Sequence, residues 1–221
     1  MSTELVTKRQ IMGGIASVAK ALGHAHRLEL VEQLAQGAKA VEGLAAATGL
    51  SVANASQHLQ QLRRSGIVHA RRDGKHVLYS LAAGPIVEVL SMLGAIARAN
   101  LAEMREAVAS FGRDSDALEP VSRAELQQRL DEASAILLDV RPADEYRLGH
   151  LPGALNITVE GLAERLADLP RDREIVAYCR GPYCILSFEA VRLLREAGFT
   201  VRRLEDGFPE WRAAGLAVET A

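Results

Sequence analysis

The chain of 221 residues is longer than one ordinary domain and suits two domains of about 100 residues each. Hydrophobic residues make up 48% of the sequence and charged residues 24%, which excludes a disordered or fibrous chain. Residues 1–110 hold 12 Lys and Arg against 8 Asp and Glu, whereas residues 111–221 hold 14 against 20. A basic half joined to an acidic half indicates that the first half meets a polyanion.

The two cysteines, Cys179 and Cys184, lie within six residues of each other. They cannot join distant segments, which excludes the class of small domains held together by several disulfides. The N-terminal residues lack the apolar core of a signal peptide, and the longest apolar stretch, residues 81–97, is broken by Pro85 and Glu88. We therefore expect a cytoplasmic protein with no membrane partner.

The first hundred residues carry apolar residues at helical spacing, as at Leu30 and Leu34. Ser51 is a candidate N-cap, and Asp73-Gly74 is a strong signal for a β-hairpin. After the first helical region we predict a short helix, a third helix, two strands and a long helix, at residues 41–48, 52–64, 68–72, 76–81 and 85–108. This order is typical of a mainly α winged helix-turn-helix domain with a β wing.

The third predicted helix has two different faces. Its expected buried face consists of Val52, Ala55, Leu59 and Leu62. The opposite face carries amides and a guanidinium but no carboxylate, from Asn54, Gln57, Gln60, Gln61 and Arg64. Amides and arginine pair with base edges in the major groove, whereas a carboxylate would repel phosphate. The pattern predicts DNA reading; the alternative is an ordinary solvated face.

The predicted hairpin and the end of the third helix are strongly basic. One acid, Asp73, stands among five cations within thirteen positions, namely Arg63, Arg64, Arg71, Arg72 and Lys75. A positive wing suits a phosphate backbone or a minor groove and predicts salt-sensitive binding; the alternative is a solvated run of charges. The candidate DNA-binding residues are Ser51, Asn54, Ser56, Gln57, Gln60, Arg64, Arg71, Arg72, Lys75 and His76.

Residues 15–105 contain the segments ALGHAHRLELVEQL, VEGLAAATGLSVANASQHLQQLRRSGIV and RRDGKHVLYSL, which resemble the ArsR-type winged-helix repressors. The resemblance implies a homodimer, formed by the first and last helices of the domain, that binds a palindromic double-stranded operator. Many members bind metals through a Cys-x-Cys in the helix before the recognition helix, but that helix has no thiol here. We expect His24 and His26 to be surface or packing residues, and we expect no metal site and no cofactor.

Residues 110–121 lack hydrophobic periodicity and collect Gly, Asp, Ser and Pro, which predicts a linker between domains at 1–109 and 122–221. In the second domain, Ser122 and Glu125 form a capping box that opens a helix. Short apolar runs then alternate with helical stripes, with strands predicted at 135–140, 174–178 and 201–204 and a helix around 186–197. This alternation predicts an α/β domain with a parallel sheet.

Cys179 follows a predicted strand, and the loop 180–183 leads from it to Cys184 and a helix. N–H groups at a helix N-terminus, together with the charge of Arg180, typically lower the pKa of a thiol from about 8.5 to about 3.5–7.5. The sequence therefore predicts a nucleophilic thiolate at Cys179; the alternative is a buried core cysteine. A Cys-x5-Arg phosphatase loop is excluded because the sixth residue after Cys179 is Ile185, so we expect a persulfide on this loop.

Three motifs in order resemble the rhodanese sulfurtransferases over about residues 122–219: the segment LDVRPADEYRLGHLPGALNI, the loop at Cys179, and DGFPEW followed by AGLAV. The resemblance implies that Cys179 accepts sulfur from thiosulfate, a polysulfide or a low-molecular-weight persulfide. The expected sulfur-binding loop consists of Arg180, Gly181, Pro182, Tyr183 and Ile185, and the expected supports of the loop are Asp139, Arg141, Glu145 and His150.

Cys184 is a candidate resolving thiol that would form a disulfide or a sulfur-bridged link with Cys179. A spectator thiol on the first helical turn and, less favoured, a Cys-x4-Cys metal site are the alternatives.

Two functions from different classes follow from these patterns. The first is a sulfur-responsive transcriptional regulator, in which sulfur on Cys179 changes the affinity for an operator. The second is a thiosulfate or persulfide sulfurtransferase whose DNA-binding domain is autoregulatory. A third function, sensing of arsenic or another oxyanion, ranks last because the chain has only two thiols to bind it.

Overall fold

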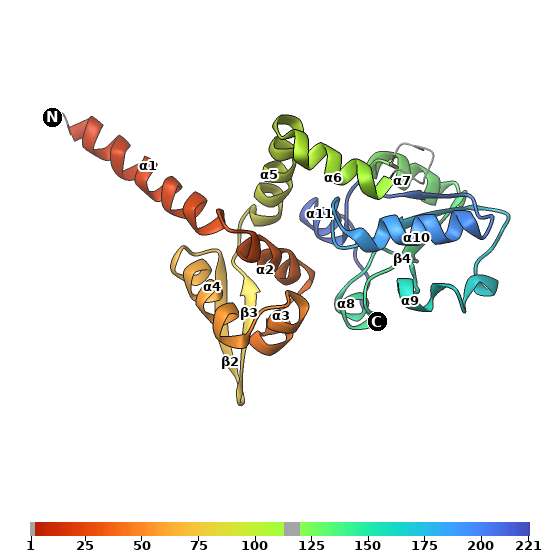
Figure 1. Cartoon of the computed structure of the whole chain (residues 1–221), viewed down its shortest axis with the longest axis horizontal. Helices are drawn as coiled ribbons and strands as arrows, with labels where there is room; N and C mark the ends of the chain where they lie inside the picture. Colours follow the sequence, from red (N-terminus) through yellow and green to blue (C-terminus); the bar gives the residue numbers. More distant parts are fainter. Residues whose placement is uncertain (1–2, 113–119) are drawn as a thin grey trace. The chain divides into compact units, whose positions relative to one another are not determined.

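The computed structural model describes residues 3–112 and 120–221, which form two compact units (Figure 1). The units are Met1–Ile86 and Val87–Ala221. This division falls after the first residue of the helix that follows Pro85, a helix that the sequence assigns to the first domain. The predicted linker at 110–121 lies largely outside the described residues, so the predicted domain bounds stay a prediction.

The first unit is a winged helix-turn-helix domain, as predicted. Its elements are α1 (Thr3–Leu22), α2 (Ala25–Gln36), β1 (Lys39–Ala40), α3 (Val41–Ala47), α4 (Val52–Arg64), β2 (Val68–Asp73) and β3 (His76–Leu81). The strands form an antiparallel sheet in the order β1-β3-β2, and the β2–β3 hairpin extends beyond α3 and α4 in Figure 1. Strand β1 is not predicted by the sequence, because two residues carry no periodicity.

Helix α4 is anchored in the core of this unit by one apolar face. Ala55, Leu59 and Leu62 are fully buried, as predicted, but Val52 is 46% exposed. The prediction for Val52 is wrong because this residue opens the helix, beyond the part that packs on the core. The buried Arg27 adds a polar anchor, since its Nη1 donates to Gln61 Oε1 at 2.8 Å.

The hairpin has a two-residue turn at Gly74-Lys75, since Asp73 pairs with His76 across the strands. Gly74 has a φ of 58°, in the left-handed region that glycine adopts without steric cost. The sequence signal at Asp73-Gly74 therefore identifies the hairpin correctly but places the turn one residue too early.

The second unit is an α/β domain with a parallel sheet, again as predicted. Its elements are α5 (Ile86–Asn100), α6 (Ala102–Gly112), α7 (Arg123–Asp131), β4 (Ala135–Asp139), α8 (Ala143–Leu148), β5 (Leu155–Asn156), α9 (Val159–Leu162), a 3-10 helix (Leu166–Asp168), β6 (Glu174–Tyr178), α10 (Ile185–Glu196), β7 (Val201–Arg203) and α11 (Phe208–Ala213). The strand order is β5-β4-β6-β7, and each neighbouring pair is parallel.

Alternate residues of β6 pack on opposite faces of this sheet. Ile175 and Ala177 join the apolar cluster that includes residues of α9 and α10, whereas Val176 and Tyr178 join the cluster that includes α7 and α11. Because both faces of β6 are covered, the residue that follows the strand emerges between two packed layers. That residue is Cys179.

The single long helix predicted at 85–108 is instead two helices, α5 and α6, separated at Leu101. Two side chains bind carbonyls at the end of α5: Asn100 Nδ2 donates to Ile96 O at 2.9 Å, and Arg105 Nη1 donates to Ala99 O at 2.9 Å. Both side chains therefore bind carbonyls in the last turns of α5 and stabilise the end of that helix.

Helix α7 begins as predicted at Ser122, whose Oγ accepts a hydrogen bond from Glu125 N at 3.2 Å. The Glu125 carboxylate pairs with Arg129 and Arg202, rather than being the second half of the expected capping box. Among the described residues, no helix combines the length and the apolar character needed to cross a lipid bilayer.

Candidate functional sites: a cysteine loop and a DNA-binding surface

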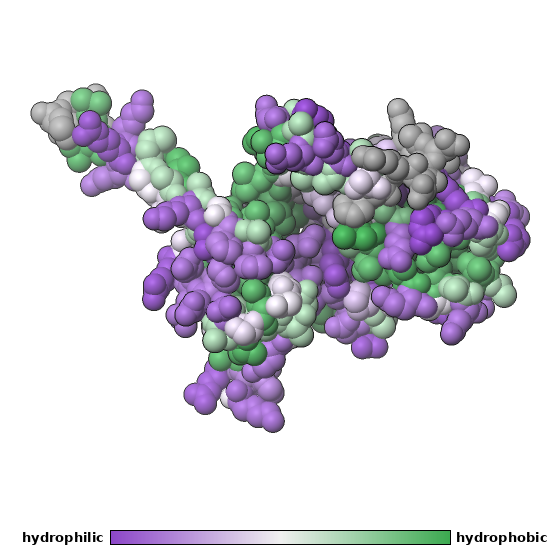
Figure 2. Space-filling view, viewed as in Figure 1, coloured by the Kyte–Doolittle hydropathy of each residue, from purple (hydrophilic) through white to green (hydrophobic). Residues whose placement is uncertain are grey.

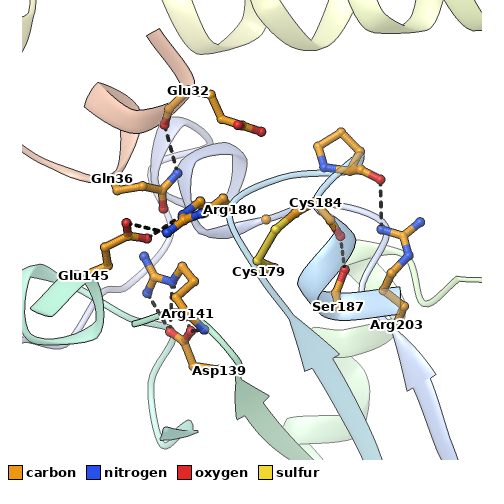
Figure 3. Close-up of a disulfide and its surroundings, with 12 residues drawn as sticks. Glu32, Gln36, Asp139, Arg141, Glu145, Cys179, Arg180, Cys184, Ser187 and Arg203 are labelled. Carbon is orange, nitrogen blue, oxygen red and sulfur yellow. Dashed lines mark hydrogen bonds and ion pairs between the residues drawn. A yellow bond between two sulfur atoms is a disulfide. The ribbon is translucent and has the colours of Figure 1, made fainter. Parts of the chain in front are cut away.

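The two cysteines stand at the two ends of a four-residue loop between β6 and α10. Cys179 directly follows β6, Cys184 is the N-cap of α10, and their Cα atoms lie 6.2 Å apart. The two residues are joined by a disulfide, which Figure 3 shows as the link between the strand end and the helix start. Ser187 Oγ donates to Cys184 O at 3.0 Å and fixes the first turn of the helix. The two sulfur atoms thus share one bond, and the resolving role of Cys184 stays a prediction.

Both cysteines are buried in this disulfide form. Cys179 is 1% exposed and Cys184 is 8% exposed, and both belong to the apolar cluster of α9 and α10. The sequence predicts an accessible thiol at Cys179, and the disulfide form does not have one. Cys179 is buried because both faces of β6 are covered by other elements. The glycine and proline of the loop suggest exposure and do not indicate this covering.

Arg180 is held by a carboxylate rather than directed at the sulfur atoms. Its Nε and Nη2 each donate to Glu145 at 2.9 Å, and Glu145 is 1% exposed (Figure 3). A bidentate pair of this kind fixes the guanidinium in orientation as well as in position. Glu145 of α8 therefore holds the side chain of the first loop residue, and its supporting role in the chemistry stays a prediction.

A fully buried ion pair joins Arg141 and Asp139 at the end of β4. Arg141 Nη2 donates to Asp139 Oδ2 at 2.6 Å and to Gly149 O at 2.7 Å, and both charged side chains are 0% exposed. Burial works against the charge of Arg141, but the hydrogen bond and the charge of Asp139 outweigh it and raise the pKa of this guanidinium. The ring of Phe208 lies 4.3 Å below the cation and adds a cation–π contact.

His150 supports the C-terminal segment of the domain. Its ring stacks on Tyr146 of α8 at 3.7 Å between centroids, and its backbone exchanges hydrogen bonds with Glu219. Tyr178, which precedes Cys179, accepts a hydrogen bond from Leu151 N at 3.0 Å, and burial raises its pKa. The sequence analysis did not single out Tyr178, because a tyrosine at the end of a strand is common in cores.

The start of α11 also packs against the loop. Phe208 N donates to Cys179 O at 3.0 Å, and a Cβ on Gly207 would lie 2.5 Å from the carbonyl carbon of Arg180. Glu210 Oε2 accepts from Gly207 N at 3.0 Å, and burial raises the pKa of this carboxyl. The sequence did not identify Gly207 and Glu210 as parts of the site. Both lie in the DGFPEW motif, which could have indicated them.

The remaining loop residues differ in their surroundings. Gly181 is buried, Pro182 and Tyr183 are half-buried, and Ile185 is 52% exposed on the first turn of α10. Pro182 O accepts from Arg203 Nη1 at 3.3 Å. The loop is therefore fixed along its length by Glu145, Arg203 and the backbone of α11.

Three histidines of the first unit, His24, His26 and His58, pack together near the start of α2. The ring centroid of His24 lies 5.4 Å from that of His26 and 4.5 Å from that of His58 on α4. Burial, followed by the nearby charges, lowers the pKa of His58. Within residues 3–112 and 120–221, no group of three or more His, Cys, Asp or Glu side chains is arranged to hold a metal ion.

The predicted DNA-binding residues lie on α4 and the hairpin. Ser51 caps α4 by accepting from Asn54 N at 3.3 Å. All of these residues except the half-buried Ser56 are exposed: Ser51, Asn54, Gln57, Gln60, Arg64, Arg71, Arg72, Lys75 and His76. His76 Nδ1 lies 3.8 Å from Glu42 Oε2, and Figure 2 shows hydrophilic residues gathered at the tip of the hairpin.

Together these features define a class of protein: a winged helix-turn-helix unit joined to an α/β domain with a cysteine loop at the end of a parallel strand. Residues 25–70 match the family model "Bacterial regulatory protein, arsR family", and residues 122–214 match the model "Rhodanese-like domain". Both resemblances expected from the sequence are thereby confirmed.

The chain is 44% identical over 213 residues to "HTH-type transcriptional regulator Rv0324" of Mycobacterium tuberculosis, an alignment that covers 96% of this chain and 93% of the relative. The chain therefore belongs to the family of transcriptional regulators that combine an arsR-family helix-turn-helix domain with a C-terminal rhodanese-like domain.

Each half also has relatives of its own. A "Sulfurtransferase" of Allochromatium vinosum is 33% identical over 95 residues, which cover 42% of this chain and 87% of the relative. Among solved structures, the homodimeric winged helix-turn-helix DNA-binding domain of Mb0332 from Mycobacterium bovis is 34% identical, with a TM-score of 0.41, and the match covers 47% of this chain and 93% of that domain.

Proposed function

We propose that this transcriptional regulator responds to sulfane sulfur, and that the bonding state of Cys179 and Cys184 sets its affinity for an operator. The observation that carries the proposal is the disulfide between the two ends of the loop. The chain has two cysteines, so its thiol chemistry is confined to this one loop in the rhodanese-like half.

The proposed chemistry has two balanced steps. The Cys179 thiolate attacks the terminal sulfur of a persulfide R–S–SH, so that a Cys179–sulfur bond forms, the S–S bond of the donor breaks, R–S⁻ leaves, and the proton stays on the transferred sulfur. The Cys184 thiolate then attacks Cys179 Sγ, which forms the disulfide and releases HS⁻. The transferred sulfur takes up the two electrons that the two cysteines lose.

Burial of the disulfide fits a product state rather than a state that receives sulfur. The reduced loop must expose Cys179 for a donor to reach it, and Gly181 gives the loop the backbone freedom for this movement. The start of α10 next to Cys184 supplies N–H groups and a positive helix end that favour a thiolate. Formation of the disulfide then seals the sulfur atoms among apolar residues.

DNA binding is assigned to α4 and the β2–β3 hairpin. Gln57 and Gln60 of α4 are the proposed readers of base edges, and Arg71, Arg72 and Lys75 are the proposed phosphate contacts. These side chains are already exposed, so this surface needs no rearrangement of its own fold. We place the protein in the cytoplasm, because an operator-binding protein must reach the chromosome.

A homodimer on a palindromic operator is the proposed assembly. Helix α1 supports it, because Ile11, Ile15 and Val18 recur at spacings of four and three and are 56%, 58% and 41% exposed. An apolar stripe of this kind on a long helix is stabilised by a second copy.

The experiment compares four preparations of the full chain in a gel shift: wild type and Cys179→Ser, each reduced and each treated with polysulfide. The probe is a duplex that the reduced wild type selects from a random pool. We expect operator affinity to change about 5- to 150-fold on treatment of the wild type, the usual range of coupling between two sites, and to stay constant in Cys179→Ser. Equal affinity in all four preparations would remove the sensing role.

Intact mass identifies the step that fails. Cys184→Ser is the matched variant, since it keeps Cys179 but cannot close the disulfide. It should retain an added sulfur atom after polysulfide treatment, whereas the wild type should lose two hydrogen atoms instead. Absence of any mass change in both proteins contradicts sulfur uptake at Cys179.

A second candidate function is sulfur transfer to an acceptor with multiple turnovers, with an autoregulatory DNA-binding domain. The similarity of the second half to a sulfurtransferase of Allochromatium vinosum favours it. Steady-state consumption of thiosulfate in the presence of cyanide, with no change of operator affinity, would support this enzyme instead. Burial of Cys179 favours slow, switch-like chemistry over rapid turnover.

A further inference from the structure

Helix α5 lies against the cysteine loop within the second compact unit. Ser91, Gly94 and Arg98 recur at spacings of three and four and therefore share one face of this helix. Ser91 Oγ donates to Glu210 Oε1 at 3.0 Å, which joins α5 to α11 beside the loop. Arg98 lies close enough to Arg203 for its charge to act on that guanidinium, which in turn holds the carbonyl of Pro182.

The ring of Tyr183, in the loop, packs on α5 at Gly94. A Cβ on residue 94 would lie 2.9 Å from Tyr183 Oη and 3.0 Å from Cζ, so any larger side chain displaces the ring. The backbone of Gly94 is helical and does not require a glycine. Glycine inside a helix costs about 1 kcal/mol relative to alanine, so its presence here is explained by the tyrosine ring.

Glu210 makes a second contact between the loop and α5. Its carboxylate accepts from Gly207 N and from Ser91 Oγ, each at 3.0 Å. A Cβ on Gly181 would lie 3.7 Å from Glu210 Oε1, so the middle of the loop packs directly against the same carboxylate. A movement of Gly181 or Gly207 therefore reaches Ser91 through one side chain.

The opposite face of α5 is apolar and exposed. Val89, Leu93 and Ile96 are 40%, 40% and 53% exposed, and at 100° per residue they lie across the helix from Ser91 and Gly94. Figure 2 shows apolar residues over this part of α5. The helix thus carries two distinct faces, one against the loop and one free to pack elsewhere, and both move if the helix moves.

We propose that Tyr183 and Glu210 transmit the bonding state of Cys179 and Cys184 to helix α5, with Gly94 as the seat of the tyrosine ring. This inference rests on the proposed function for its natural trigger, the closing of the disulfide. Closing joins the two ends of the loop, so it changes the position of Gly181 and Tyr183 between them. Tyr183, Glu210, Ser91 and Gly94 act here as positioning residues, since none of them reacts with sulfur.

Hydrogen exchange of the full chain, read over residues 87–100, tests the inference. One sample is kept reduced, and the other is oxidised with diamide, which closes the disulfide without any sulfur donor. We expect oxidation to change the exchange of α5 in the wild type and in Tyr183→Phe, which keeps the ring. We expect the change to be lost in Tyr183→Ala and in Ser91→Ala. The matched control is Met92→Ala, an exposed position of α5 that should keep the full response.

A double-mutant cycle adds a readout that general loss of structure would not produce. Gly94→Ala alone should displace the ring and lose the response, and adding it to Tyr183→Ala should have no further effect, because the clash has already been removed. Unchanged exchange of α5 on oxidation of the wild type, or a full response in Tyr183→Ala, would overturn the inference. The gel shift with polysulfide reports separately on the proposed function: a response of α5 to diamide without any effect of polysulfide on operator affinity would sink the function and leave this inference standing.

Discussion

The proposed DNA-binding surface and the cysteine loop differ most in the exposure of their charged side chains. On α4 and the hairpin, Gln57, Arg71, Arg72 and Lys75 stand in solvent, where they can meet a ligand directly. Around the loop, Arg141 is 0% exposed and held by Asp139. The proposed DNA-binding residues are therefore accessible without a change of fold, whereas the proposed sulfur chemistry requires the packed loop to change. Both regions use arginine, so the exposure of the charged side chains, more than their residue type, distinguishes the proposed binding surface from the proposed switch.

The largest effect is expected from removing the buried cation. Arg141→Met leaves the Asp139 carboxylate buried without its partner and should lower the free energy of unfolding by about 3–5 kcal/mol. Urea denaturation of the full chain measures this loss. The control is Arg192→Met, which removes an exposed i,i+4 pair with Glu196 and should cost about 0.3–0.5 kcal/mol. Equal losses in the two variants would show that the support of the loop is no more critical than the surface.

A smaller effect is expected from the wing. Arg71→Ala and Arg72→Ala should each weaken DNA binding about equally on all sequences and reduce the slope of log affinity against log salt by about 1, because each removes one phosphate contact. Fluorescence anisotropy at several salt concentrations measures both quantities. Arg165→Ala, an exposed cation of the second unit, is the matched control and should leave the slope unchanged. A slope that does not change in either wing variant contradicts the assigned surface.

The smallest effect concerns the carboxyl between the loop and α5. Burial raises the pKa of Glu210 in the folded protein above its value in the unfolded chain, so the folded state holds this proton more tightly. The resulting stability is fully present below the unfolded pKa and is lost as pH rises through the raised, folded pKa. As pH rises above the ordinary pKa range of a glutamate, the free energy of unfolding of the wild type should therefore fall relative to that of Glu210→Gln. Urea denaturation at several pH values measures the difference, and a constant difference is the contrary result.

The sequence was most informative where the periodicity of single elements decided the structure. The spacing of Ala55, Leu59 and Leu62 predicted α4 with its correct bounds, and the apolar run before Cys179 predicted β6. It was less informative where side chains compete for backbone groups, as at the break between α5 and α6 near Leu101. Short elements such as β1 and α11 were missed, since a few residues carry too little pattern.

What the sequence determined by itself was the order of the two folds, the parallel sheet, the motifs of each domain and the place of the two thiols at the two ends of the loop that follows β6. These features depend on local spacing and on motifs that are contiguous in the chain. Only the tertiary structure decided that Cys179 is sealed at 1% exposure, that Glu145 holds Arg180, and that Gly94 receives the ring of Tyr183. Each of these depends on side chains brought together from separate elements, and the packing of layers that does so is not encoded in any one segment.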